Sequence, residues 1–199
     1  MTEETNVPER KLRHDSTQEF DTVMESIAAS PPMNHPAWHI NRPPGSPWPI
    51  KAEDISPVAW WRTLPSDAYR DAEQLVLRAL VKHIGVLHGG DGLRAALAGD
   101  AAAAIDVAFT LMPIEEITLT VDIAMTALCR CALAPNASAA LVMAQVLGLT
   151  DLDHGLATEL AASWYCYGLR HSTDQRKFRE AKSVLLKSFK DWHYRGEST

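Results

Sequence analysis

The densest group of metal-ligating side chains in the sequence lies in one short segment near residue 155. It holds two aspartates, a histidine and a glutamate: Asp151, Asp153, His154 and Glu159. Carboxylate and imidazole groups are common ligands of divalent metal ions, and a bound metal can activate water for hydrolysis. The two aspartates also stand where a helix is expected to begin, and acids are favoured there by the helix dipole. A small α-helical metal-dependent enzyme with its site around Asp151–Glu159 is therefore one hypothesis, the second of two alternatives to the function inferred below.

The three cysteines give no sign of a nucleophile or of a disulfide framework. Cys129 and Cys131 project from different sides of one expected helix, and Cys166 lies among aromatic residues. None stands at a helix N-terminus or beside a fixed cation, the settings that lower the pKa of a thiol. We expect three buried free thiols, as in a reducing compartment. No phosphate-binding loop, dinucleotide fingerprint or Gly-x-Ser-x-Gly elbow occurs, so the main prediction is a non-enzymatic protein without metal or cofactor.

Residues 144–150 resemble the first helix and turn of a helix-turn-helix motif, with Gly148 at the turn and Thr150 as a cap. The helix that would then enter the DNA groove begins with acidic residues and has no lysine or arginine before Arg170. Phosphate contacts supply most of the non-specific affinity for DNA, and carboxylates oppose them. The segment is therefore expected to be an ordinary helix–helix connection.

Charge is distributed unevenly along the chain. The 199 residues include 19 Lys and Arg and 25 Asp and Glu, for a formal net charge of −6. The expected last helix, residues 170–195, holds eight basic and three acidic residues and is +5, which leaves −11 for the rest. Its periodicity predicts an apolar stripe of Phe178, Ala181, Leu185, Phe189 and Trp192. The other side is predicted to carry Arg176, Arg179, Lys187 and Lys190, with Tyr194 nearby.

A basic helix face with an adjacent aromatic residue has three interpretations. It can be a solvated outer face whose last cations favour the helix dipole, a contact for an acidic protein surface, or a contact for a nucleic-acid backbone. The overall acidity of the chain counts against an autonomous nucleic-acid binder, although a subunit of a larger complex is not so constrained.

The first 56 residues are predicted to form an N-terminal arm, and residues 57–199 a helical body. Nine of the twelve prolines fall in residues 1–57. Ser16 and Glu19 form a capping box that predicts one helix over residues 17–29. The apolar residues of this helix form a single stripe, which consists of Phe20, Val23, Met24 and Ile27. Because so short a helix is only marginally stable alone, this stripe is expected to pack against another surface.

A proline-rich strap follows this helix over residues 31–50. Prolines cannot donate backbone hydrogen bonds, so an extended conformation is expected. The strap carries Trp38 and Trp48. Disordered linkers are poor in aromatic residues, so both tryptophans are expected to dock on a surface, either of the chain's own body or of a partner.

The body is predicted to be a compact all-α domain of seven or eight helices. Capping residues, prolines and glycines divide it into a short helix that opens at Pro57 and includes Trp60 and Trp61, and into periodic segments near residues 66–87, 93–98, 101–112, 113–133, 137–147, 150–169 and 174–194. The last segment is expected to be capped by Thr173. Residues 117–123 alternate as a strand would, but no second such run exists to pair with them, so a helix is expected. The stripe predicted to be buried on the second segment is Ala68, Ala72, Leu75, Val76, Ala79, Leu80, Ile84 and Leu87.

The most apolar region, residues 117–147, is interrupted by Asp122, Arg130 and Pro135 and is expected to be core rather than a membrane span. The chain begins with polar residues that do not resemble a secretory signal. Together these features predict a non-enzymatic subunit or adaptor of a larger cytoplasmic assembly. Its partners would be other protein subunits, bound through the arm and the basic last helix. The first alternative is a subunit that contacts nucleic acid with the same helix.

Overall fold

The structure is a computed structural model that describes residues 48–87, 90–152 and 154–196, with the backbone alone for 86–87 and 188–196. These residues form an all-α fold without strands, which confirms the predicted fold class. The helical interpretation of residues 117–123 is confirmed for residues 119–123, whereas residues 117 and 118 precede the helix. The predicted helix 17–29 and Trp38 lie outside the described residues. Three short 3-10 helices come first: η2 (Ala52–Asp54), η3 (Pro57–Arg62) and η4 (Ser66–Ala68). Seven α-helices follow: α2 (Asp71–Leu87), α3 (Asp91–Ala98), α4 (Ala101–Thr110), α5 (Leu119–Leu133), α6 (Ala137–Leu149), α7 (Ala157–His171) and α8 (Gln175–Gly196).

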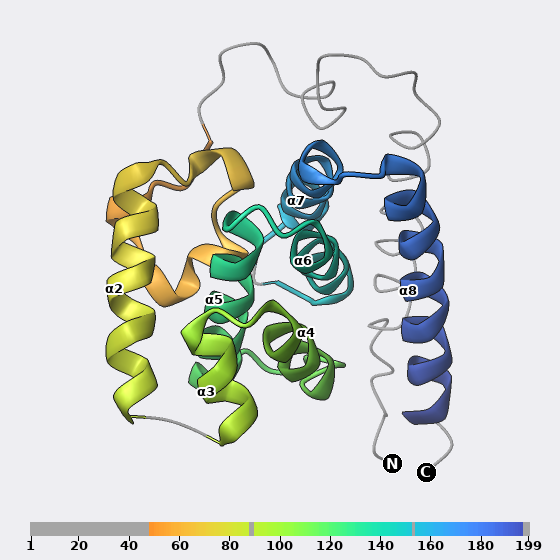
Figure 1. The fold of residues 1–199 in the computed structure, drawn as a ribbon, viewed down its shortest axis with the longest axis horizontal. Coiled ribbons are helices and arrows are strands. Elements are labelled where there is room, and N and C mark those ends of the chain that lie inside the picture. Colours follow the sequence, from red (N-terminus) through yellow and green to blue (C-terminus); the bar gives the residue numbers. More distant parts are fainter. Residues whose placement is uncertain (1–47, 88–89, 153, 197–199) are drawn as a thin grey trace, which may run out of the picture.

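Helices α5, α6 and α7 form the centre of the fold. Every residue of Val121–Cys129, Ala139–Leu147 and Leu160–Cys166 is buried, because these helices are apolar on nearly all sides and have neighbours on nearly all sides. Helix α2 lies at one edge of this centre and α8 at the opposite edge (Figure 1). None of the helices in the described part of the chain is long and apolar enough to span a bilayer.

Local capping chemistry sets most helix boundaries. The Asp100 carboxylate accepts from the backbone N–H of Ala102 at 2.9 Å and begins α4, as the sequence predicts. The prediction that a helix begins at Pro113 is wrong. Residues 113–118 are irregular, and the Thr118 hydroxyl caps α5 by accepting from the N–H of Val121.

Two further predicted helix starts are corrected in the same way. The Thr150 hydroxyl donates back to the carbonyl of Val146 at 2.7 Å, so Thr150 ends α6, and α7 begins only at Ala157. Helix α8 is capped by Asp174 rather than by Thr173, since the Asp174 carboxylate accepts from the N–H groups of Arg176 and Lys177.

The predicted core stripe of α2 is wrong at its centre. The helix buries Leu77 and Val81, which are one turn apart, and it packs against α5 and α3. Leu75 and Val76, which the sequence pattern assigns to the core, are 63% and 43% exposed. The helix is apolar on more than one side, so its periodicity does not decide which side faces inward.

The described end of the strap packs on the chain's own body. Trp48 donates from Nε1 to the carbonyl of Thr63 at 2.7 Å, and its ring is half-buried against the core. Trp60 in turn donates to the carbonyl of Ala52 at 3.2 Å. Ile50 and Ile55 also pack against the core, so residues 48–55 are structurally continuous with the helical body.

Candidate functional site

The outer side of α8 presents accessible cations. The side chains of Arg176 and Lys177 are 88% and 81% exposed, and Lys187 is exposed as well. Arg176 pairs with Glu180 at 2.9 Å and Lys177 with Asp174 at 3.8 Å. Exposed pairs along a helix are worth only a few tenths of a kcal/mol, so a partner can compete for these cations. The side chains of Lys190 and Tyr194, two further predicted site residues, lie outside the described part.

Arg179 does not share this exposed side, although the sequence pattern groups it with Arg176. It is half-buried, and its Nε has no hydrogen-bond partner among the residues that the structure describes. Burial raises the pKa of the Tyr165 phenol, and the Arg179 guanidinium opposes that shift. Lys182, one turn further along α8, is buried, and its Nζ lies 5.8 Å from the centroid of the Tyr165 ring. These two cations belong to the packed side of α8, so the exposed basic surface is narrower than predicted.

Close packing near Phe178 holds α8 to the body. The ring centroids of Phe178 and Tyr165 are 5.4 Å apart. A Cβ at Gly168 would lie 2.8 Å from the Phe178 ring and 3.1 Å from the Cβ of Ala140, closer than such atoms normally approach. The absence of a side chain at Gly168 therefore lets α8 cross α7 closely, while Arg176 and Lys177 stay on the exposed side of α8.

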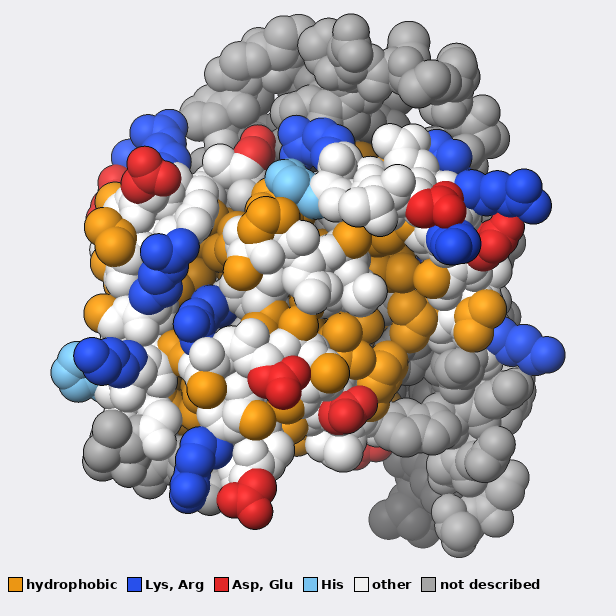
Figure 2. Space-filling view, in the orientation of Figure 1, with side chains coloured by type: hydrophobic (Ala, Val, Ile, Leu, Met, Phe, Trp, Pro, Cys, Tyr) orange, Lys and Arg blue, Asp and Glu red, His pale blue; other side chains and the backbone are white. Residues whose placement is uncertain are grey.

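A second exposed surface lies on α2. We define the α2 outer face as five residues that are exposed along one side of this helix: Asp71, Ala72, Leu75, Ala79 and Lys82. Hydrophobic and basic side chains are visible together at this edge of the molecule (Figure 2). Sequence reasoning missed the surface because its apolar residues fit a core stripe. No feature of the sequence alone would have separated the two sides of α2.

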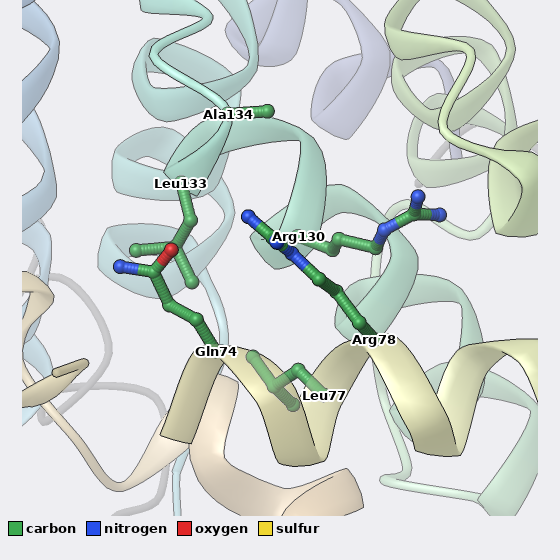
Figure 3. A pocket seen from close by; sticks show the side chains of 6 residues that line it. All are labelled: Gln74, Leu77, Arg78, Arg130, Leu133 and Ala134. Carbon is green, nitrogen blue, oxygen red and sulfur yellow. The ribbon is translucent and has the colours of Figure 1, made fainter. Parts of the chain in front are cut away.

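A pocket of about 310 Å³ lies between α2 and the end of α5. Its lining residues are Gln74, Leu77, Arg78, Arg130, Leu133 and Ala134 (Figure 3). Arg130 turns its guanidinium toward α3, where it donates to the carbonyl of Leu97 at 2.6 Å. Arg78 reaches toward the carboxyl end of α5, whose partial negative charge favours a cation. The lining holds no carboxylate, thiol or imidazole, so the pocket offers no acid–base or nucleophilic pair.

In the segment that the sequence suggests as a metal site, residues 151–159, the His154 side chain forms hydrogen bonds within the fold. Its Nε2 donates to the carbonyl of Arg62 at 2.7 Å, and its Nδ1 accepts from the N–H of Leu156 at 3.3 Å. Asp151 and Glu159 are exposed, and Asp153 lies outside the described residues. Among the residues that the structure describes, no three His, Cys, Asp or Glu side chains are grouped closely enough to hold a metal ion.

The three cysteines are free and buried, as predicted. Burial raises the pKa of the Cys129 thiol to about 12, although the neighbouring Tyr69 phenol acts in the opposite direction. Burial also raises the pKa of Cys131, more than the Arg130 guanidinium lowers it. Both thiols are therefore protonated at neutral pH and poorly suited to nucleophilic attack.

Comparison with known proteins finds no match to this chain among family models, curated proteins or solved structures. Hypotheses about its function therefore rest on its own surfaces.

Proposed function

We propose that the protein is a non-enzymatic subunit of a larger intracellular assembly and binds an acidic protein surface through α8. The observation that carries this proposal is the exposure of Arg176, Lys177 and Lys187 on a helix that is +5 in a chain that is otherwise −11. A charge of one sign, gathered on one helix at one edge of the molecule, favours a partner of the opposite sign.

The way α8 is attached supports a binding role for its outer side. Phe178 and Lys182 are buried on the inward side. Within the described part of the chain, Arg176 and Lys177 make only exposed ion pairs, one with Glu180 of α8 and one with the capping Asp174. A partner can therefore replace these weak contacts without unfolding the helix or breaking its packing on α7. Residues 1–47 remain a candidate second contact with the assembly.

A nucleic-acid contact is the alternative, because phosphates would attract the same cations. It is less favoured because Arg179 is turned inward, which leaves Lys187 about 15 Å along the helix axis from Lys177. A duplex backbone is most strongly bound by several closely spaced cations.

The test compares the wild-type chain with a triple variant, Arg176→Glu, Lys177→Glu and Lys187→Glu. A control with the same change in net charge reverses three exposed cations elsewhere: Lys51→Glu, Arg70→Glu and Arg94→Glu. Each tagged protein is used to purify partners from the native source. We expect the wild type and the control to retain the same protein partner and the α8 variant to lose it. Equal retention by all three would overturn the proposal.

Fluorescence anisotropy with a labelled DNA duplex and a labelled RNA strand distinguishes the nucleic-acid alternative from the proposed protein contact. The proposal predicts weak binding to both, with little difference between the α8 variant and the control. Strong binding that falls steeply with salt, and that only the α8 variant loses, would establish the nucleic-acid function instead.

A further inference from the structure

We infer that the α2 outer face pairs two copies of this chain, with their α2 helices antiparallel around a two-fold axis near Val76. The inference concerns the edge of the molecule opposite α8 and does not depend on the function proposed above.

The first support is the exposure of apolar residues in the middle of α2. Leu75 is 63% exposed, and Ala72 and Ala79 are exposed three positions before it and four positions after it. Residues at this spacing share one side of a helix. The alanines flank the leucine and are small enough to let a second helix approach closely. Val76, which is 43% exposed, lies at the margin of the same surface.

The second support is the order of charges along the helix. Asp71 stands in the first turn of α2, and Lys82 stands in its second half. Neither side chain forms an ion pair with any other residue that the structure describes. Asp71 and Lys82 are separated by about 16 Å along the axis. An antiparallel copy that crosses near Val76 therefore places each Asp71 beside the Lys82 of the other copy, and the two-fold axis forms this pair twice.

The charge pattern favours a second copy over the arm of the same chain. The arm segment 17–29 carries Glu19, Asp21 and Glu25 and no lysine or arginine. On the α2 outer face its acids could pair with Lys82, but this segment has no cation for Asp71. A second copy instead offers an opposite charge to Asp71 and to Lys82.

A charge exchange tests the pairing directly. Sedimentation equilibrium of the full chain is measured for the wild type, for Lys82→Glu, for Asp71→Lys and for the variant that carries both changes. We expect a concentration-dependent dimer for the wild type. Each single change should weaken it by about tenfold or more, because like charges then meet twice across the axis. The double variant should recover the wild-type dissociation constant within a few-fold.

A further variant, Leu75→Glu, places a carboxylate in the apolar centre and should abolish the dimer. The three side chains that these variants change, Asp71, Leu75 and Lys82, are all exposed, so circular dichroism should show unchanged helix content in every variant. A wild-type chain that remains monomeric from micromolar to millimolar concentration would overturn the inference. So would a dimer that the single changes leave intact, or that the double variant fails to restore.

Discussion

Asp122 of α5 carries a buried carboxylate that accepts hydrogen bonds from two side chains of η3. Its Oδ1 accepts from the Nε1 of Trp61 at 2.7 Å and from the Nε of Arg62 at 3.2 Å. The Arg62 carbonyl also accepts from His154, so this one turn of chain connects α5 with the segment before α7. A charged acceptor is well suited here, because it satisfies both a buried indole N–H and a partly buried guanidinium.

Replacement of this carboxylate should therefore be costly. Asp122→Ala leaves the Trp61 N–H without its acceptor and should lower the free energy of unfolding by about 3 kcal/mol. Asp122→Asn keeps an acceptor oxygen for Trp61 and should cost less. Urea unfolding followed by tryptophan fluorescence measures both. Asp106→Ala, at an exposed position on α4, is the control, and an equal loss in Asp122→Ala and Asp106→Ala would refute this role.

Burial of the Cys129 thiol should make the free energy of unfolding depend on pH in the alkaline range. Its thiol has an ordinary pKa near 9.0 in the unfolded chain and a pKa of about 12 when buried. Between these values the unfolded chain loses a proton that the folded protein keeps, so stability is fully present below about pH 9 and falls as the pH rises. The free energy of unfolding should fall by up to about 1.4 kcal/mol per pH unit from this one group. Burial also raises the pKa of Tyr69, which extends the fall above pH 10.

The variant Cys129→Ala isolates this contribution. It should lose some stability at every pH because a buried thiol is removed, but its stability should decline less steeply than that of the wild type above pH 9. Urea unfolding at a series of pH values between 7.5 and 10.5 gives both slopes. Parallel slopes would show that Cys129 does not cause the pH dependence.

At the scale of the helices, the crossing of α6, α7 and α8 depends on Gly168. Gly168→Ala inserts a methyl group against Phe178 and Ala140, and overpacking of this kind costs about 1–3 kcal/mol. Gly85→Ala in α2 is a matched control, because its new Cβ would only touch Leu97 at 3.9 Å and alanine favours the helix. Thermal unfolding should show a lower midpoint for Gly168→Ala and an equal or higher one for Gly85→Ala. A midpoint for Gly168→Ala no lower than that of the wild type would contradict the close crossing.

The helices also show what the sequence could predict. Asp100 and Asn136 mark helix starts correctly, since a cap is a local interaction among three or four neighbouring residues. Thr150 fits a helix start equally well in sequence, yet its hydroxyl bonds backward to α6. The inward side of α2 was not predictable, because the choice between Leu75 and Leu77 is made by α3 and α5. The same holds for Arg179, which turns inward because Tyr165 of α7 lies beside it.

At the scale of the whole molecule, the two proposed contact surfaces lie at opposite edges (Figure 1). A dimer formed through α2 would leave both copies of α8 outermost. Two basic helices on one particle can engage a repeated acidic partner together, and such bivalent binding exceeds the affinity of either helix alone. The pairing of chains and the partner contact are therefore compatible within one assembly.

The boundary between arm and body is the last feature of the whole chain that an experiment can decide. The change in composition places it near Ser56, whereas Trp48, Ile50 and Ile55 already pack on the core. Two truncated chains, one beginning at Trp48 and one at Ser56, differ only by this packed segment. The shorter one loses the Trp48–Thr63 hydrogen bond and several half-buried apolar side chains, and it should be less stable by about 3 kcal/mol. If urea unfolding gives equal free energies of unfolding for the two truncated chains, the boundary lies at Ser56. If the chain that begins at Ser56 is clearly less stable, residues 48–55 belong to the body.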